Sequence, residues 1–170
     1  WKPARVPGCV HTDLWAIGRI GDPFWRDNEF RQQWIDKQDW IYRTEFTVDE
    51  NLLARGHVEL LFEGLDTYAE VYVNDKLLLS ADNMFRRWRT DVKKSLVRGA
   101  NELKIRFRSP VSVTAPRFDA APLPLFGGPN NDRGRDGGVG ERKLAVYNRK
   151  VQSHFGWDWG PRFLTCGIWR

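Results

Sequence analysis

The residues best suited to chemistry are concentrated near the end of the chain, in residues 154–162. This segment reads His-Phe-Gly-Trp-Asp-Trp-Gly-Pro-Arg, so it places three aromatic side chains, a carboxylate and an arginine within nine positions. An indole packs against the apolar C–H face of a sugar ring, and a carboxylate accepts two charge-assisted hydrogen bonds from ring hydroxyls. Because Trp157 and Asp158 are adjacent, together they have the chemistry of a sugar-binding subsite.

The local backbone decides whether these side chains can act together. In an extended strand, Trp157 and Trp159 would face one side and Asp158 the other. The flanking glycines and the proline permit a bend that would bring all three to one ligand. In the alternative, both tryptophans lie in the core and Asp158 pairs with Arg162. The residues alone favour that alternative, because Trp is usually a packing residue.

Short β-strands form most of the chain that must position this segment. Five segments are predicted as strands, most of them from alternating apolar and polar side chains: residues 42–48, 58–63, 68–73, 85–92 and 103–108. Asn74 and Asp75 separate two apolar runs and favour a tight hairpin turn. Short alternating strands with brief helices predict an all-β fold, an antiparallel β-sandwich of the jelly-roll kind.

Two short helices are predicted ahead of the strands, over residues 12–18 and 28–37. Thr12 and Asn28 are expected to cap their N-termini.

Three side chains of the second helix are predicted to be structural. Phe30 and Trp34 stand four residues apart, so they would share a helix face and act as packing anchors. Glu29 would lie at the helix start, where the helix dipole favours an acidic side chain.

Composition is that of one domain and disfavours several classes of function. The 170 residues are 41% hydrophobic and 14% aromatic, enough for one substantial core, and no apolar run approaches the ~20 residues of a membrane span. The net charge of +5 is compatible with a nucleic-acid partner. However, the basic side chains of residues 103–108 alternate with apolar ones, as on the outer face of a strand. We therefore expect neither a nucleic-acid nor a membrane partner.

The cysteines and histidines are too sparse to predict a scaffold or a metal site. Cys9 and Cys166 are too few for a disulfide framework, and a bridge between them is not favoured. His11 and His57 have no ligand at suitable spacing, so no metal is expected.

Residues 115–142 are predicted to form a long mobile surface loop within the domain. They are rich in Pro, Gly, Asn, Asp and Arg and bury too little apolar surface to order themselves. A phosphate-binding loop is excluded, because no Gly-Lys-Ser or Gly-Lys-Thr follows the glycines.

Several segments resemble, in the same order, those of the β-mannosidases in glycoside hydrolase family 2, which also contains β-galactosidases and β-glucuronidases. They are residues 6–14, 22–29, 39–43, 62–69, 71–75 and 154–162. The stretch between Val111 and Asn148 matches poorly.

The resemblance implies a fold and a function. Residues 1–170 would be the N-terminal galactose-binding-like jelly roll of a retaining exo-β-mannosidase, which removes terminal non-reducing β-D-mannose. The family's catalytic glutamates lie on a separate barrel, absent from this chain, so none is expected here and the chain alone should be inactive. The domain is expected to be truncated at its C-terminal edge. The chemistry is carboxylate-based, so no metal or organic cofactor is expected.

The resemblance also implies a site and partners. Trp157 and Asp158 would contact the terminal mannose, with His154, Trp159 and Arg162 in supporting positions. The expected partners are a β-mannoside oligosaccharide and the remaining domains of the same polypeptide. A freestanding carbohydrate-binding module and a glycosidase of different sugar specificity stay open as alternatives. An exported, periplasmic or lysosomal location and a bacterial cytoplasmic one are equally open.

Overall fold

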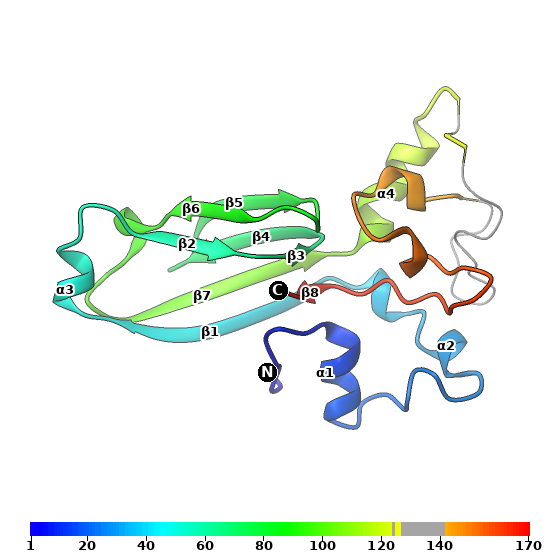
Figure 1. The fold of residues 1–170 in the computed structure, drawn as a ribbon, viewed down its shortest axis with the longest axis horizontal. Helices are drawn as coiled ribbons and strands as arrows, with labels where there is room; N and C mark the ends of the chain where they lie inside the picture. Colours follow the sequence, from blue (N-terminus) through cyan, green and yellow to red (C-terminus); the bar gives the residue numbers. More distant parts are fainter. Residues whose placement is uncertain (124, 127–141) are drawn as a thin grey trace.

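Antiparallel sheets dominate the computed structural model, which describes residues 1–123, 125–126 and 142–170 (Figure 1). A four-stranded sheet has the order β1-β7-β4-β5, and two further sheets pair β2 with β6 and β3 with β8. The strands are β1 (Trp40–Val48), β2 (Glu59–Phe62), β3 (Leu65–Asp66), β4 (Tyr68–Val73), β5 (Lys76–Asp82), β6 (Trp88–Asp91), β7 (Gly99–Arg108) and β8 (Gly167–Ile168).

The helices are short and most lie outside the sheets. They are α1 (Val10–Ala16), α2 (Asn28–Arg31), α3 (Glu50–Leu53) and α4 (Pro110–Asp119), with 3-10 turns η1 (Ile35–Lys37), η2 (Lys93–Ser95), η3 (Ala145–Tyr147) and η4 (Gln152–His154). Figure 1 shows α2, α4 and the segment leading to β8 at one end of the sheets, with α3 at the other. No helix in the described part of the chain has the length and apolar character needed to cross a bilayer.

The core lies between the four-stranded sheet and the β2–β6 pair. Val71 on β4 stands opposite Ile105 on β7, both are fully buried, and Phe62 and Trp88 pack on the same cluster from the other sheet. Alternation places Arg106 on the solvent face, where it pairs with Asp39 at 2.7 Å. The predicted antiparallel β-sandwich is confirmed.

The β4–β5 hairpin has the predicted turn. Asn74 and Asp75 both have positive φ, 50° and 62°, the left-handed conformation that a two-residue hairpin turn of this kind requires.

The helix starts differ from prediction. Helix α1 begins at Val10 with Cys9 as its N-cap, so Thr12 is not the cap. Instead, its hydroxyl accepts a hydrogen bond from the Cys9 N–H at 3.2 Å. The N-cap position of helix α2 is Asp27 rather than Asn28, whose side-chain amide donates to the Asp22 carbonyl at 2.7 Å.

The second predicted helix is not continuous over residues 28–37. It ends at Arg31 because Gln32 and Gln33 turn inward, where they donate hydrogen bonds to the carbonyls of Gly21 and Arg162. Phe30 and Trp34 consequently do not share a helix face, and both are partly exposed rather than core anchors.

The prediction of a loop over residues 115–142 was also wrong for its first residues. Helix α4 continues to Asp119, with the Ser109 hydroxyl accepting from the Ser112 N–H at its N-terminus and Pro116 inside it. The sequence predicted a loop here because residues 115–142 are rich in Pro, Gly and polar side chains, and an internal proline ordinarily disfavours a helix. Residue 124 and residues 127–141 of that loop lie outside the described residues.

Both thiols are free, although the segments around them are neighbours. The Gly8 N–H donates to the Ile168 carbonyl and the Val10 N–H to the Cys166 carbonyl, each at 2.9 Å. Cys9 therefore lies against Gly167, and a Cβ on Gly167 would stand 2.5 Å from the Gly8 oxygen and 2.8 Å from the Cys9 Cα.

We predict that Gly167→Ala destabilises the chain by about 1–3 kcal/mol, since the added methyl meets backbone atoms that cannot rotate away. Chemical denaturation of the 170-residue chain measures the change. Gly56→Ala is the matched control, because a Cβ at Gly56 meets nothing within 4 Å. An equal effect of the two substitutions would contradict the close approach at Gly167.

Candidate functional site

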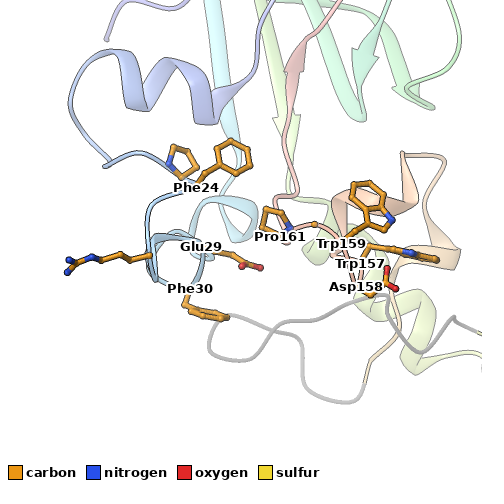
Figure 2. Close-up of a pocket in the computed structure, with 10 residues that line it drawn as sticks. Phe24, Glu29, Phe30, Trp157, Asp158, Trp159 and Pro161 are labelled. Carbon is orange, nitrogen blue, oxygen red and sulfur yellow. The ribbon is translucent and has the colours of Figure 1, made fainter.

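An open pocket of about 740 Å³ lies between the segment around α2 and the loop of residues 157–161 (Figure 2). One wall consists of Pro23, Phe24, Arg26, Glu29 and Phe30; the other consists of Trp157, Asp158, Trp159, Gly160 and Pro161. Three of the sequence-predicted residues, Trp157, Asp158 and Trp159, therefore line one pocket.

The loop that carries these residues is a tight reversal. Phe155 and Arg162 form an antiparallel bridge at its base, and the Trp157 N–H donates to the Gly160 carbonyl at 3.0 Å. The three side chains thus leave a turn rather than a strand, and Figure 2 shows the two indoles pointing in different directions.

Phe155 anchors one side of this loop. Its ring is fully buried with Leu144, Ala145 and Leu164 in a second, smaller core that packs against α4. Helix α4 and the chain after residue 142 therefore support the loop from behind.

Arg162 anchors the other side. Its side chain is 1% exposed, and its guanidinium pairs with Asp36 and donates a hydrogen bond to Gln33. Its backbone N–H donates to Oε1 of Glu29 at 2.7 Å. The loop is thereby fixed to α2 and η1, the elements that form the facing wall.

The alternative that Asp158 pairs with Arg162 is wrong, because Arg162 is engaged by Asp36. Within the part of the chain that the structure describes, the Asp158 carboxylate is exposed and has no hydrogen-bond partner, so both of its oxygens can accept from a ligand. Trp157 is half-buried and Trp159 is 74% exposed, so Trp159 is not a core residue either.

Burial has the largest effect on the pKa of Asp36, the carboxyl group that pairs with Arg162 at the base of the loop. It raises the pKa of Asp36, and the adjacent Arg162 opposes that rise. Asp36 Oδ1 and two guanidinium nitrogens of Arg162 are buried without hydrogen-bond partners among the described residues. The ion pair therefore depends strongly on having both of its members.

His154 lies away from the pocket. It lines a separate hollow with Cys9, Asp66 and Thr165, and its Nδ1 is 3.4 Å from the Thr165 hydroxyl. Burial, with a further contribution from the Lys150 ammonium, lowers the pKa of His154 to about 4. The structure thus does not bring His154 to Trp157 and Asp158.

Lys150 and Asp66 form a second buried ion pair beside that hollow. Their charged atoms are 2.5 Å apart, and both side chains are almost fully buried. Burial, and then Lys150, also lowers the pKa of His11 to about 4; its ring packs edge-on against Phe163. Both imidazoles are therefore neutral at pH 7.

Sequence reasoning missed the wall opposite Trp157. Phe24 and Arg26 were not identified as site residues, and Glu29 and Phe30 were assigned to packing alone. All but Phe30 fall within residues 22–29, one of the segments that carries the family resemblance, and that resemblance was the signal that could have identified them.

Among the described residues, no group of three or more His, Cys, Asp or Glu side chains is placed to hold a metal ion.

Comparison with known proteins identifies the family. All of residues 1–170 match the family model described as "Glycosyl hydrolase 2 galactose-binding domain-like". The chain belongs to this family. The predicted family and its jelly-roll fold are thus confirmed, and the pocket of this glycosyl hydrolase 2 domain lies between the segment around α2 and the loop of residues 157–161.

Several proteins similar to this chain are β-mannosidases. The domain is 38% identical to the β-mannosidase of Bos taurus, over 99% of this chain and 18% of that protein, and 37% identical to β-mannosidase B of Emericella nidulans, over 97% and 18%. The crystal structure of a β-D-mannosidase from Dictyoglomus thermophilum superposes with a TM-score of 0.89 at 45% identity, covering 100% of this chain and 20% of that one. The domain thus spans about a fifth of the length of these relatives.

A more distant structure shares the fold. The exo-chitosanase CsxA of Amycolatopsis orientalis is 24% identical, with a TM-score of 0.57 over 64% of this chain and 13% of its own.

We predict that Arg162→Met destabilises the domain by about 3–5 kcal/mol, because it leaves the buried Asp36 carboxylate uncompensated. Arg31→Met is the control: Arg31 pairs with Asp27 at the surface, where such a pair contributes about 0–1 kcal/mol. Denaturant unfolding measures both. The double variant Arg162→Met/Asp36→Leu should recover part of the loss, and no recovery would contradict this explanation.

We also predict that the free energy of unfolding falls as the pH drops from about 6.5 to about 4. Unfolded histidine titrates near pH 6.5, whereas His11 and His154 titrate near 4 in the folded domain. In that window the unfolded state binds more protons, so acid favours unfolding. Thermal melts across the window measure how steeply the stability falls with pH, and this fall should be shallower in His11→Gln and in His154→Gln than in the parent domain. A fall as steep as the parent's in both variants would refute the assignment.

Proposed function

We propose that this domain is the N-terminal substrate-recognition part of a retaining exo-β-mannosidase, which hydrolyses terminal non-reducing β-D-mannose residues. One observation carries the proposal: Trp157 lines the same open pocket as Asp158, whose carboxylate has no hydrogen-bond partner among the described residues. Similarity to β-mannosidases along nearly the whole chain supports the choice of sugar.

Each residue has a defined task in this proposal. The Asp158 carboxylate accepts hydrogen bonds from two ring hydroxyls of the terminal mannose, and Trp157 forms the apolar wall beside the ring. These contacts hold the sugar in the geometry that the reaction requires, so they contribute to binding of the transition state without supplying a reacting group.

The reacting groups belong to another part of the polypeptide. Retention of configuration needs two carboxyl groups about 5–5.5 Å apart, one acting as the nucleophile and one as the acid and base. We assign these to the catalytic barrel of the whole protein, so the 170-residue chain alone is inactive. The partners of the domain are then the oligosaccharide substrate and the other domains of the same polypeptide.

We predict that Asp158→Asn in the full-length protein lowers kcat/KM for a chromogenic β-mannoside about a hundredfold, the loss expected when two charge-assisted hydrogen bonds are weakened. Glu45→Gln is the control, since Glu45 is an exposed carboxylate on β1 whose side chain contacts no ion-pair partner among the described residues.

The same assay with the 170-residue chain should give no hydrolysis. Full activity in Asp158→Asn would contradict the role of Asp158, and a parent inactive on β-mannosides would contradict the sugar. Measurable mannose affinity of a naturally freestanding chain would instead favour a carbohydrate-binding module.

A further inference from the structure

The wall opposite Trp157 has the same two kinds of group as the Trp157–Asp158 wall. Phe24 is 75% exposed and Phe30 is also partly exposed, and the Glu29 carboxylate lines the pocket between them and the loop (Figure 2). Each side of the pocket therefore offers aromatic surface together with a carboxylate, the combination that suits a sugar ring.

Glu29 is held in a fixed orientation. Its Oε1 accepts the Arg162 N–H at 2.7 Å, while its Oε2 has no partner among the residues that the structure describes. Because Arg162 is itself buried and paired with Asp36, the free oxygen of Glu29 is a positioned acceptor rather than a mobile one.

Phe24 is likewise supported from behind. Its ring meets the edge of Phe163 with centroids 5.6 Å apart, and its N–H donates to Oδ1 of Asp22 at 2.9 Å. Arg26 follows in the same wall with a positive φ of 51°, and its guanidinium stacks 5.2 Å from the centroid of Trp25. Phe24 is thus an exposed aromatic side chain that packing and a backbone hydrogen bond hold in place.

The pocket is larger than one sugar ring requires. Its volume of about 740 Å³ lies in the range of about 300–1,000 Å³ that accommodates drug-sized ligands, whereas a single hexose is smaller than such a ligand. With recognition groups on both sides, the pocket has space for two linked sugars.

We propose that Phe24, Glu29 and Phe30 form a second sugar subsite, which binds the sugar unit linked to the terminal mannose. This inference rests on the proposed function, since it assumes that the terminal mannose lies against Trp157 and Asp158. The free oxygen of Glu29 accepts from a hydroxyl of the second ring, and Phe24 packs against its apolar face. The domain thereby favours an oligosaccharide over a mannoside with a small leaving group.

The test compares two substrates in the full-length protein: a β-linked mannobiose, and methyl β-mannoside, which has no second ring. Glu29→Gln keeps an oxygen for the Arg162 N–H but removes the charge. It should lower kcat/KM for mannobiose about fivefold more than for methyl β-mannoside, as expected for loss of charge assistance to one hydrogen bond. Phe24→Ala should lower the ratio of kcat/KM for mannobiose to kcat/KM for methyl β-mannoside several-fold, because apolar contact with the second ring is lost.

Two matched controls should keep the parent ratio. Phe85→Ala removes an exposed aromatic that lines the separate hollow beside His154, and Glu45→Gln neutralises an exposed carboxylate on β1. Melting temperatures of all four variants are measured alongside.

An unchanged ratio in both Glu29→Gln and Phe24→Ala would overturn the second subsite. This includes the case in which kcat/KM falls equally for both substrates, with or without a lower melting temperature. A wall that only contacts another domain would affect the two substrates alike. Asp158→Asn separates this result from failure of the proposed function. If Asp158→Asn loses activity while Glu29→Gln and Phe24→Ala keep the parent ratio, the second subsite alone is overturned. If Asp158→Asn keeps full activity, the recognition role of the domain is overturned.

Discussion

The buried ion pair between Arg162 and Asp36 is the interaction on which the candidate site depends. It joins the last loop of the chain to η1, and the backbone of Arg162 extends the connection to Glu29 on α2. Taking both charges out of water is costly, and several of their polar atoms lack partners among the described residues. Such a pair contributes less to stability than to geometry: it fixes which two loops face each other, and so where the pocket lies.

The second buried ion pair, between Lys150 and Asp66, likewise holds an irregular part of the chain in place. The chain between residue 142 and β8 has only short 3-10 turns, so few ladder hydrogen bonds hold it to the sheets. Lys150 donates to both oxygens of Asp66, on β3, and to the carbonyl of Thr165 at 2.8 Å. Its charge also helps to keep His154 neutral. An irregular segment is thereby ordered through side chains, at the cost of a domain that loses stability in acid.

The physics of this arrangement explains what could be predicted from the sequence. The strands and the Asn74–Asp75 turn follow from local alternation and turn chemistry, and the Trp157–Asp158 loop follows from its unusual composition. The break in the second helix does not, because it depends on Gln33 bonding a carbonyl 129 residues away. For the same reason Glu29 could be assigned to a helix start but not to the pocket: its partner, the Arg162 N–H, is 133 residues distant. Local patterns predict elements, whereas the site arises from pairings between distant elements.

The pocket is open to water in this domain, and its polar contacts would become stronger once a bound sugar and the rest of the polypeptide cover it. Phe24 and Trp159 line the pocket and are both largely exposed, and exposed apolar surface of that kind usually marks a binding surface. In water the Asp158 carboxylate gains little from a hydroxyl, because it exchanges one hydrogen bond for another. When a sugar and the rest of the polypeptide exclude water, the local dielectric falls and the same contact becomes stronger. On the proposed function, a domain without reacting groups therefore affects the rate: its fixed loops hold the carboxylate in place, and closure of the pocket increases the strength of the interaction.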